Sequence, residues 1–597
     1  MKIFLTAINA KYIHSNLAVY SLKAYANEYA SNVAIGEYTI NNRIDYILEQ
    51  IYKEQPDVLC FSCYIWNMSY VKQLIAEYHK LCPNVPIWLG GPEVSYEVEE
   101  FLNENPQVSG IMQGEGEETF LELCKHYVEG TVSLSDIKGI TYRECDGRVV
   151  KNPLREPIDM STIPFCYNET GDFKNRIIYY ESSRGCPFSC SYCLSSVDKK
   201  LRFRDVELVK KELAFFIEKE VPQIKFVDRT FNCKHEHAMA IWQFIKEQDR
   251  GITNFHFEIS ADLLNEEEIA LITSMRPGLI QLEIGVQSTN EATITEIKRT
   301  MKLDRLKETV KRIQNAANIH EHLDLIAGLP YEDYETFAKS FDEIYLLKPN
   351  QLQLGFLKVL KGSYMYEHAK EYEMVYYDTP PYEVLKTKWL TFDEVLKIKQ
   401  VEEVLETYYN SGQFEITMKL LENLFCSPFY MFQEFGGFYE KRGYFAMSHS
   451  RIRRCEILLE FVEDCFAKKN AGETTTFIGE VQEEAAVCAM LEESLTFDLY
   501  YRENCKSRPS WAPSIAEFKR ETKHYCKNGA LSHVEPFHYE FPRKDERRVE
   551  NLPTYREECQ YVLFDYAKRD PLDHQAEIRV VTKLEGELHD KAHEGNS

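Results

Sequence analysis

Three cysteines within one short segment are the residues of this chain best suited to chemistry. Cys186, Cys190 and Cys193 have the spacing C-x3-C-x2-C, and no fourth cysteine follows closely. Thiolates this close together bind a metal ion or an iron–sulfur cluster. A structural zinc ion takes four ligands, whereas three thiolates suit a cluster that leaves one iron open. A zinc loop and a chance group of buried thiols are the alternatives.

The residues before the first cysteine give this segment a context. The apolar run Ile177–Tyr180 predicts a strand, and Arg184-Gly185 stands just before Cys186. A strand followed by this cysteine spacing resembles the radical S-adenosylmethionine (radical SAM) enzymes. The resemblance implies that the three cysteines are catalytic metal ligands of a 4Fe–4S cluster. It also implies that the open iron binds the amino and carboxylate groups of SAM.

Length, charge and cysteine content restrict the class of protein. A chain of 597 residues is expected to form about three domains. Its formal net charge of −25 argues against general nucleic-acid or anionic-membrane binding, because phosphate contacts need clustered Lys and Arg. No apolar run approaches the length that crosses a bilayer, and Met1–Ile8 is too short for a signal-peptide core. The 17 cysteines therefore indicate reduced thiols and a cytoplasmic protein.

Residues 1–130 alternate apolar strands with amphipathic helices. This alternation predicts an α/β domain with a doubly wound, flavodoxin-like parallel sheet, whose ligands bind beyond the carboxyl ends of the strands. The expected strands are Ile3–Ile8, Val33–Tyr38, Val58–Cys63, Pro86–Leu89 and Val108–Met112.

Several of these strands are followed by loops with glycine and polar residues. Glycine lets the backbone approach a ligand closely, and a helix that starts after the loop favours polar or anionic groups. Because these loops precede the cysteine segment, they together resemble the cobalamin-binding domain found ahead of many radical SAM domains. That resemblance implies cobalamin contacts from Asn9, Tyr12, Gly90, Gly91, Gly114, Glu115 and Gly116.

Two features of this domain do not support further functional assignments. The D-x-H-x-x-G run that supplies a lower cobalt ligand elsewhere is absent, so we interpret His14 as an ordinary loop histidine. A domain that kept the fold and lost cobalamin remains an alternative. The C-x-x-C pair Cys60 and Cys63 lies on a predicted strand, where the two side chains should point to opposite faces, and we interpret both as structural cysteines.

Residues 131–175 are expected to form a linker with a hairpin near Gly139–Val150. Strand–helix alternation resumes over 176–365 and predicts a partial (β/α)6 barrel, with catalytic residues at the carboxyl ends of its strands. The expected strands are Ile177–Glu181, Ile224–Val227, Phe255–Ile259, Ile280–Ile284, His322–Ile326 and Gln351–Phe356.

The resemblance to radical SAM enzymes also assigns SAM contacts to these strand ends. Asp228 and Thr230 stand where relatives place polar groups against the SAM amino group, although the more widespread Gly-Gly-Glu motif is absent. A carboxylate taken singly is more often a surface or capping group, and it is the shared position that favours a site. The remaining candidates are Glu283 and Gln287 for the ribose and carboxylate, and Gly328 and Tyr192 for the adenine.

Residues 366–597 are expected to form an α+β extension of unknown function, as in a bacterial subgroup of the family. A capping box at Thr391 predicts the start of a helix, and short alternating runs at Tyr561–Tyr566 and Ala576–Val581 predict strands. An auxiliary iron–sulfur cluster would form here only if the fold collected the separate cysteines 426, 455, 465, 488, 505, 526 and 559.

The resemblance implies reductive cleavage of SAM to a 5′-deoxyadenosyl radical and, with cobalamin, methylation of an unactivated carbon. It also implies an external electron donor of the flavodoxin or ferredoxin type. Radical rearrangement, cyclisation or oxidation without methyl transfer is the alternative among enzymes, and a redox or cobalamin sensor is the alternative among binding proteins. Whether the substrate is a small molecule or a peptide is not indicated.

Overall fold

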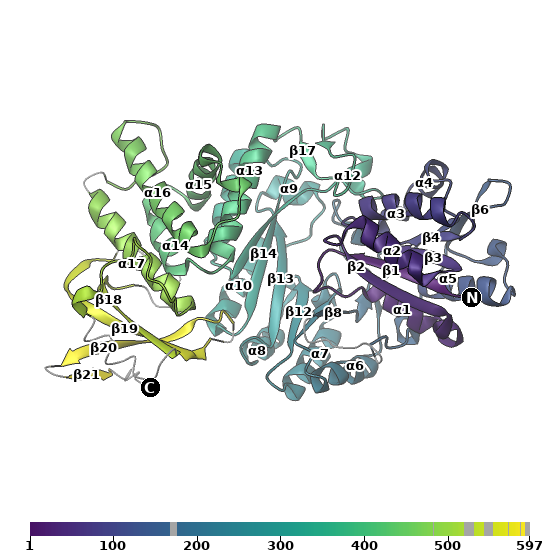
Figure 1. The fold of residues 1–597 in the computed structure, drawn as a ribbon, viewed down its shortest axis with the longest axis horizontal. Helices are drawn as coiled ribbons and strands as arrows, with labels where there is room; N and C mark the ends of the chain where they lie inside the picture. Colours follow the sequence, from purple (N-terminus) through teal and green to yellow (C-terminus); the bar gives the residue numbers. More distant parts are fainter. Residues whose placement is uncertain are drawn as a thin grey trace.

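The computed structural model describes residues 1–167, 176–480, 483–518, 531–541, 553–570, 572–584 and 587–590. Three parts follow one another along the molecule: a parallel sheet with its helices, a second parallel sheet, and a helical region with a small antiparallel sheet (Figure 1). In the described residues no helix has both the length and the apolar character that a membrane crossing needs.

The amino-terminal sheet has seven strands in the order β2-β1-β3-β4-β5-β6-β7. The first five are parallel and follow the flavodoxin-like order, which confirms the predicted fold class. Its strands are β1 (Ile3–Asn9), β2 (Val33–Thr39), β3 (Val58–Ser62), β4 (Ile87–Gly90), β5 (Gly110–Met112), β6 (Ile140–Arg143) and β7 (Val149–Lys151). Its helices are α1 (Leu17–Tyr25), α2 (Ile44–Glu54), α3 (Met68–Leu81), α4 (Val98–Glu104) and α5 (Glu117–Cys124).

The hairpin expected in the linker is formed by β6 and β7, and it adds to this first sheet through antiparallel pairing with β5. Two apolar clusters cover opposite faces of the sheet. Cys60 lies in one cluster with Trp88, and Cys63 lies in the other with Phe61. The two cysteines therefore point to opposite faces, as the strand period predicts, and cannot act as a dithiol.

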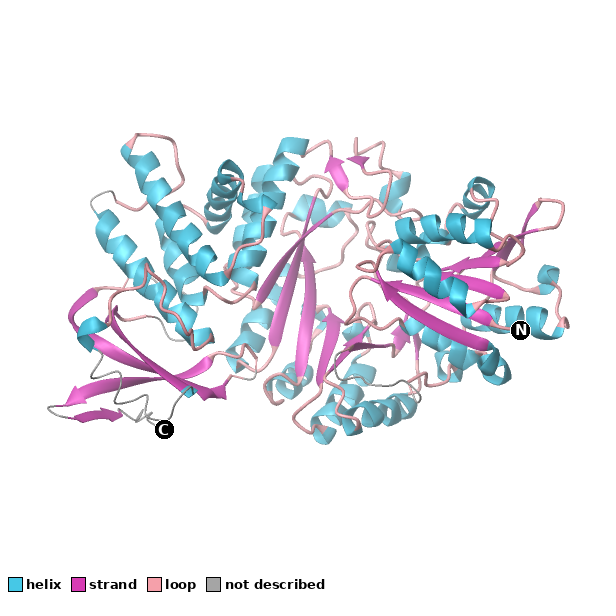
Figure 2. Ribbon diagram, viewed as in Figure 1, coloured by secondary structure: helices cyan, strands magenta, loops and turns pink. Residues whose placement is uncertain are grey.

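The second sheet has six strands in the order β15-β14-β13-β12-β11-β8, and every neighbouring pair is parallel. The sheet curves into a partial barrel with its helices on the outside, as predicted (Figure 2). The strands are β8 (Ile177–Tyr180), β11 (Gln223–Phe226), β12 (Asn254–Ile259), β13 (Ile280–Gln287), β14 (His320–Ala327) and β15 (Gln351–Phe356). The helices are α6 (Val206–Glu218), α7 (His235–Gln248), α8 (Glu266–Thr273), α9 (Glu291–Glu296), α10 (Leu303–Ala316) and α11 (Tyr334–Tyr345).

The carboxyl-terminal part is the expected α+β extension, and it shares one continuous apolar core with the barrel. The capping box predicted at Thr391 is present, since its side chain accepts from Glu394 N and Glu394 bonds back to Thr391 N. Its elements are α12 (Tyr364–Glu367), β16 (Val375–Tyr376), β17 (Val384–Lys386), α13 (Phe392–Leu405), α14 (Glu415–Leu421), α15 (Pro428–Arg442), α16 (Arg451–Asn470), α17 (Glu484–Arg502), β18 (Ser532–Tyr539), β19 (Tyr555–Arg569), β20 (Ala576–Leu584) and β21 (Glu587–Asp590).

Candidate active site between the two parallel sheets

The cysteine segment leaves the carboxyl end of β8 as a turn that is held on both sides. Residues Ser183–Arg184 (β9) pair with Arg202–Phe203 (β10), so the segment is closed into a loop. Gly185 has φ of +89°, and a Cβ there would lie 2.5 Å from the Lys200 carbonyl oxygen. Only glycine fits this close approach, which explains the Gly that precedes Cys186.

The three thiols of this loop differ in their surroundings. Cys186 and Cys190 are buried, and Cys193 is half-buried. Burial raises the pKa of Cys190, and the guanidinium of Arg299, whose Nη1 lies 3.9 Å from the Cys190 sulfur, opposes this effect. The Cys186 sulfur lies 3.8 Å from Thr230 Oγ1.

This donor set fits a cluster better than a single metal ion. Within the described ranges, no three His, Cys, Asp or Glu side chains are arranged to hold one ion. The cysteines of a 4Fe–4S cluster each bind a different iron, so their sulfurs stand farther apart than the ligands of one zinc ion. Three thiols on one loop that the β9–β10 pair closes, with a guanidinium beside Cys190, suit such a cluster.

Asp228 holds the end of β8 in place. Its carboxylate accepts hydrogen bonds from Ser182 N (2.9 Å), Ser182 Oγ (2.7 Å) and Ser183 Oγ (2.5 Å), and the residue is 1% exposed. Burial raises the pKa of Asp228 to about 6. Asp228 therefore binds the residues that connect the end of β8 to the cysteine loop. Thr230, its partner in the sequence prediction, lies beside Cys186.

The two candidate SAM contacts on β13, Gln287 and Glu283, lie at different distances from the carboxyl end of the strand. Gln287 lies at a β-bulge with φ of +75°, and its buried Oε1 has no hydrogen-bond partner among the described residues. Such a left-handed non-glycine residue costs about 1–3 kcal/mol and often marks a functional site. Glu283 lies further from the strand end, where it contacts Lys225 Nζ at 2.9 Å and His256 Nε2 at 3.1 Å.

Three charged residues near this end of the barrel were missed from the sequence. Arg299 donates to Tyr192 Oη at 3.2 Å and to the Gly285 carbonyl oxygen. Burial raises the pKa of Glu258 to about 7. It also raises the pKa of Asp324 well above its ordinary value, and the carboxylates of Glu283 and Glu258 add to that effect. Glu258 and Asp324 could have been found from the sequence, because each is a polar residue at an alternate position of an otherwise apolar strand.

Gly328 and Tyr192 have packing neighbours that account for their residue types. Gly328 has φ of +89°, and a Cβ there would lie 2.6 Å from Val384 Cγ1 on β17. Tyr192 packs against the same small apolar cluster as Val384, and its hydroxyl meets Arg299. Tyr192 therefore packs the cysteine loop against the segment that follows β15, and Gly328 packs closely against the same segment.

The glycines of the first sheet differ in what they approach. Gly91 has φ of +118°, and a Cβ there would lie 2.4 Å from the Cys63 carbonyl oxygen, so this glycine is required by packing against the end of β3. A Cβ on Gly90 would touch Met112, and one on Gly116 would touch Leu22. Gly114, with φ of +76°, faces open space.

Exposed aromatic side chains lie at the carboxyl ends of β1 and β3. Tyr12 is 67% exposed, and Trp66 is 41% exposed and stacks on Tyr64 at a centroid distance of 4.4 Å. Ligands of a flavodoxin-like sheet bind at the switch point between these two strands. Flat apolar surfaces at this place fit a large planar macrocycle such as a corrin, and the sequence prediction had overlooked Tyr64 and Trp66.

The loop after β1 is attached to the edge of the barrel. Asn9 Nδ2 donates to Glu37 (3.0 Å) and to the His14 carbonyl oxygen (3.1 Å), which fixes the loop from within. His14 Nδ1 lies 2.8 Å from Tyr179 Oη on β8. The His14 ring thus contacts the barrel, in agreement with its interpretation as a loop histidine.

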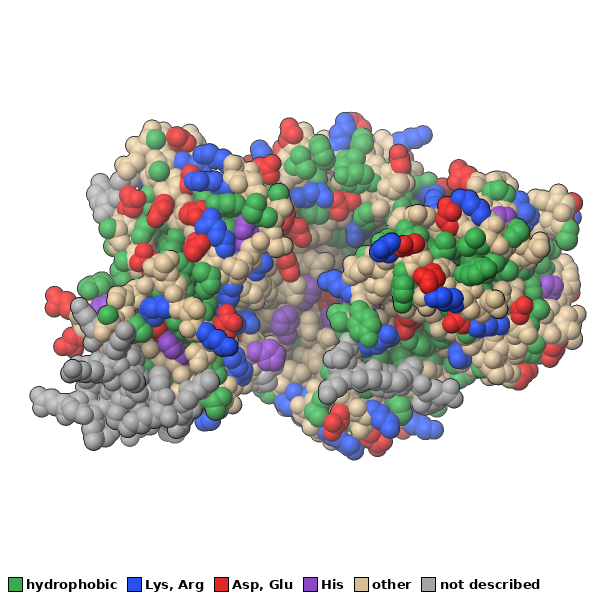
Figure 3. Space-filling view, in the orientation of Figure 1, with side chains coloured by type: hydrophobic (Ala, Val, Ile, Leu, Met, Phe, Trp, Pro, Cys, Tyr) green, Lys and Arg blue, Asp and Glu red, His purple; other side chains and the backbone are tan. Residues whose placement is uncertain are grey.

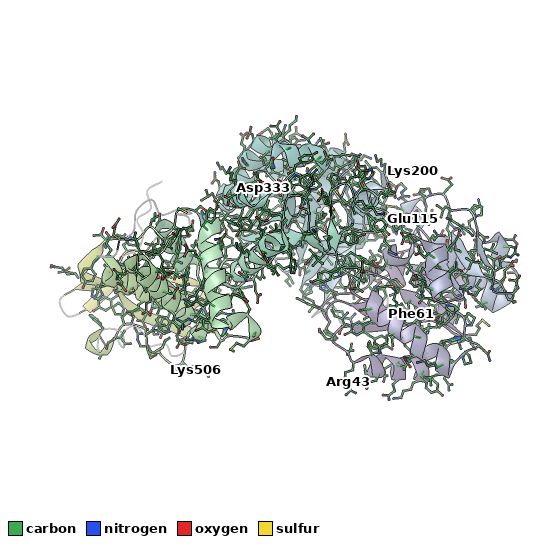
Figure 4. All side chains as sticks on the ribbon, turned by 90° about the horizontal axis from the view of Figure 1, so that it is seen from above. Arg43, Phe61, Glu115, Lys200, Asp333 and Lys506 are labelled. Carbon is green, nitrogen blue, oxygen red and sulfur yellow. The ribbon has the colours of Figure 1, made fainter. Side chains whose placement is uncertain are left out.

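The loop after β5 meets the cysteine loop through a set of half-buried ion pairs, here called the Arg184 cluster. Arg184 contacts Glu115 (2.8 Å), Glu117 (2.6 Å) and Glu181 (2.9 Å). Arg202 adds a second contact to Glu115 at 3.2 Å. Glu115 lies where the amino-terminal part meets the barrel (Figure 4). The structure therefore gives Glu115 an ion-pair role between the two sheets.

The loop after β4 is tied to the segment that follows β15. Tyr366 Oη donates to Glu97 at 2.7 Å, and Tyr382 Oη donates to Glu93. Together with the Arg184 cluster, these bonds hold the carboxyl edge of the first sheet against the cysteine loop. A ligand on that edge would lie next to the three thiols.

The cysteines of the extension do not form a second site in the described residues. Cys455 and Cys465 are buried on α16, and Cys526 lies outside the described residues. The six described cysteines belong to no group that could hold a metal ion.

Family comparisons match each part of this architecture. Residues 5–124 match the B12 binding domain, residues 180–344 match the radical SAM superfamily, and residues 370–568 match the family described as protein of unknown function (DUF4080).

Two curated relatives cover the first two parts. Cobalamin-dependent radical SAM methyltransferase TokK of Streptomyces tokunonensis is 25% identical over 306 residues, which are 47% of this chain and 44% of TokK. This chain therefore spans less than half of that relative. The uncharacterized methyltransferase PH0819 of Pyrococcus horikoshii is 26% identical over 381 residues, which are 61% of this chain and 80% of that protein.

The solved structure of the cobalamin-dependent S-adenosylmethionine radical enzyme OxsB, with aqua-cobalamin and S-adenosylmethionine bound, shares the fold. It aligns with a TM-score of 0.53 and 15% identity, over 83% of this chain and 80% of OxsB. The chain thus carries a B12 binding domain over residues 5–124, a radical SAM domain with the cysteine loop over residues 180–344, and a DUF4080 domain over residues 370–568.

Proposed function

We propose that the chain cleaves SAM reductively at a 4Fe–4S cluster bound by Cys186, Cys190 and Cys193, and uses cobalamin to methylate an unactivated carbon. The Arg184 cluster is the observation that carries this proposal. It joins the loop that holds the cysteines to a loop of the B12-binding domain. The name of TokK, a cobalamin-dependent methyltransferase, supports methyl transfer.

When bound, the cluster supplies the electron that splits SAM into methionine and the 5′-deoxyadenosyl radical, and cobalamin supplies a methyl group for transfer. The chain itself binds and orients the reactants. The Arg299 guanidinium, beside Cys190, is placed to pair with the SAM carboxylate. The carboxylates of Glu258 and Asp324 and the free amide oxygen of Gln287 are placed to accept from the amino group and the ribose hydroxyls.

The exposed edge of the first sheet suits cobalamin for a different reason. Tyr12 and Trp66 present apolar rings, and Gly114 leaves its loop open. We propose that the rings of Tyr12 and Trp66 would hold cobalamin at this edge of the sheet. Asn9, Gly90, Gly91, Glu115 and Gly116 shape the loops that support it.

The test is anaerobic reconstitution of the purified chain with iron and sulfide, with and without cobalamin, followed by dithionite and SAM. Dithionite replaces the flavodoxin-type or ferredoxin-type donor that we propose as the partner. We expect 5′-deoxyadenosine that depends on the reductant, and tight retention of cobalamin. S-adenosylhomocysteine formed together with a methylated product would support methyl transfer. Formation of 5′-deoxyadenosine alone in the presence of substrate would favour rearrangement, cyclisation or oxidation, and a loaded cluster that never yields 5′-deoxyadenosine would indicate a sensor.

Glu258 is expected to make SAM binding depend on pH. Its pKa of about 7 in the free protein is raised by burial, and hydrogen-bond donors of SAM favour its ionised form. Below pH 7 a proton must therefore leave on binding, so SAM affinity should rise as pH increases from 5.5 to 7, by up to about tenfold per unit. Equilibrium dialysis of SAM against the reconstituted, unreduced protein measures this slope.

The Glu258→Gln variant should have a flatter slope than the wild type. Glu266→Gln is the matched control, because Glu266 is an exposed carboxylate at the start of helix α8 and pairs with Arg312 of helix α10. A slope unchanged by Glu258→Gln would show that this carboxylate does not face SAM.

A further inference from the structure

The concave side of the six-stranded barrel sheet has an unusual composition, and we call it the lumen face. Strand residues alternate between two sides, and the apolar set of β12 to β15 packs into the core beneath the outer helices. The other set faces the lumen. It comprises Asn254, His256 and Glu258 on β12, Gln281, Glu283, Gly285 and Gln287 on β13, His320, His322, Asp324 and Ile326 on β14, and Gln351, Gln353 and Gly355 on β15.

Parallel strands of barrels are ordinarily apolar on both sides, because helices cover one side and a packed interior covers the other. Here Ile326 is the one aliphatic residue of the set just given. The space-filling view shows a hollow over this part of the sheet, with histidine side chains gathered in it (Figure 3). Polar groups left without partners inside a protein cost free energy, so the composition indicates a polar occupant.

The part of the lumen face nearer the amino ends of the strands is here called the lower lumen face. Its charged groups largely neutralise one another. Lys225 pairs with Glu283, and hydrogen bonds from His256 and Lys225 hold the pKa of Glu283 below its usual range although burial opposes them. Burial lowers the pKa values of His256 and His322, so both imidazoles are neutral near pH 7. The lower face therefore presents neutral hydrogen-bonding groups around an internal ion pair.

Several of these groups are free to bind. His320 Nδ1 and His322 Nε2 are buried and make no hydrogen bond within the described ranges, although His322 Nε2 lies 3.2 Å from Asp324 Oδ1. Gln353 is exposed and hydrogen-bonds His322, and Gln351 is half-buried. Amide groups and imidazoles each offer donors and acceptors.

The lower lumen face adjoins the end of the barrel assigned to SAM and extends away from it. His322 Nε2 lies 3.2 Å from Asp324 Oδ1, whereas His320, at the amino end of β14, precedes Asp324 by four residues, which corresponds to roughly 13 Å along a strand. A molecule that reaches both places must be extended. The part near the cysteine loop would react, and the part in the lower lumen would be recognised.

We propose that the lower lumen face, formed by His256, His320, His322, Gln281, Gln351 and Gln353, binds an uncharged, polyhydroxylated part of the substrate such as a sugar. A hydroxyl group both donates and accepts, so it suits a wall of mixed amides and neutral imidazoles. An apolar macrocycle or lipid would leave these groups unpaired, and a strongly charged group would find Lys225 and Glu283 already paired. The proposal rests on the proposed function, since it names the substrate class of that enzyme.

Saturation-transfer-difference NMR on the reconstituted chain tests this, with methyl α-D-glucopyranoside as the probe and 1-hexanol, acetate and methylammonium as comparison probes. We expect saturation transfer to the sugar and a loss of at least threefold in that signal for the double variant His322→Leu/Gln353→Leu. Gln243→Leu, an exposed glutamine on the outer helix α7, is the matched control and should leave the signal unchanged. Far-ultraviolet circular dichroism and 4Fe–4S absorbance verify that each variant is folded and loaded.

Binding of the sugar that is selective and lost only in the lumen variant supports the proposal. Preference for any comparison probe, absence of sugar binding, or equal signals in the lumen and control variants would overturn it. This measurement needs no SAM cleavage. A negative result here would therefore leave the proposed radical chemistry standing, and failure of SAM cleavage would not alter the sugar-binding result.

Discussion

Replacing Cys190 with alanine reduces 5′-deoxyadenosine formation by the reconstituted chain to background, a loss of roughly 10³-fold or more. The reason is that the cluster is held by three thiols on one loop, and the loop is fixed by Gly185 and by the β9–β10 pair. With two thiols the cluster has a second open iron and no defined orientation toward SAM. Product is quantified by liquid chromatography, and iron and sulfide content and the electron paramagnetic resonance spectrum report on the cluster.

Cys233→Ala is the matched control for this experiment. Cys233 is half-buried in the short 3-10 turn Phe231–Cys233 that follows strand β11, and burial raises the pKa of its thiol to about 11. It should therefore remain a protonated, inert thiol, and its removal should preserve both cluster content and product. Equal losses in the two variants, or full activity of Cys190→Ala, would disprove the assignment of the loop.

Replacing Arg184 with methionine is expected to weaken the contact between the cysteine loop and the loop after β5 of the B12-binding domain. Removal of one partner from a fully buried ion pair costs about 3–5 kcal/mol, because the remaining charge stays buried without compensation. Here only Glu117 is fully buried, Glu115 and Glu181 are half-buried, and Glu115 keeps its contact with Arg202, so we expect a smaller cost. We expect a lower free energy of unfolding in urea, and S-adenosylhomocysteine formation that falls further than 5′-deoxyadenosine formation.

Two comparisons distinguish this role from general destabilisation. Arg176→Met removes another arginine between the two sheets, one that pairs with the single carboxylate of Glu37, and it should have a smaller effect. Adding Glu117→Gln to Arg184→Met should recover part of the stability, because it removes a stranded buried charge. If Arg184→Met keeps the wild-type ratio of the two products, the cluster of ion pairs does not position the halves of the site.

Much of the fold could be predicted because its signals are local. The β–α repeats of both sheets fix strand order through short connections, and the observed strands lie within a few residues of the predicted ones. The hairpin at β6 and β7 was recognised from its turn. Its pairing with β5 was not, because a hairpin edge can join any nearby sheet and only the packing of the chain selects one.

The site was less accessible to prediction, and the reasons differ by residue. Asp228, predicted to contact SAM, accepts hydrogen bonds from Ser182 and Ser183, which are 46 and 45 residues away in the chain, and its contact with SAM stays a prediction. Glu115 was expected to approach cobalamin, and it pairs with Arg184 at a separation of 69 residues. Choice of partner by a carboxylate depends on which donors the fold brings near, and spacing in the sequence does not report it.

The sequence by itself determined the cysteine spacing, the order of the three parts and the two parallel sheets, because ligand spacing and strand period are local properties of the chain. It also contained a second signal, the alternation of polar and apolar residues along much of β12 to β15, which was not used in the sequence-based predictions. Only the tertiary structure decided that the loops of the first sheet meet the cysteine loop through Arg184, and that the polar side of the barrel strands faces an open lumen. These facts depend on long-range packing and on the burial of charge, which arise when distant segments come together.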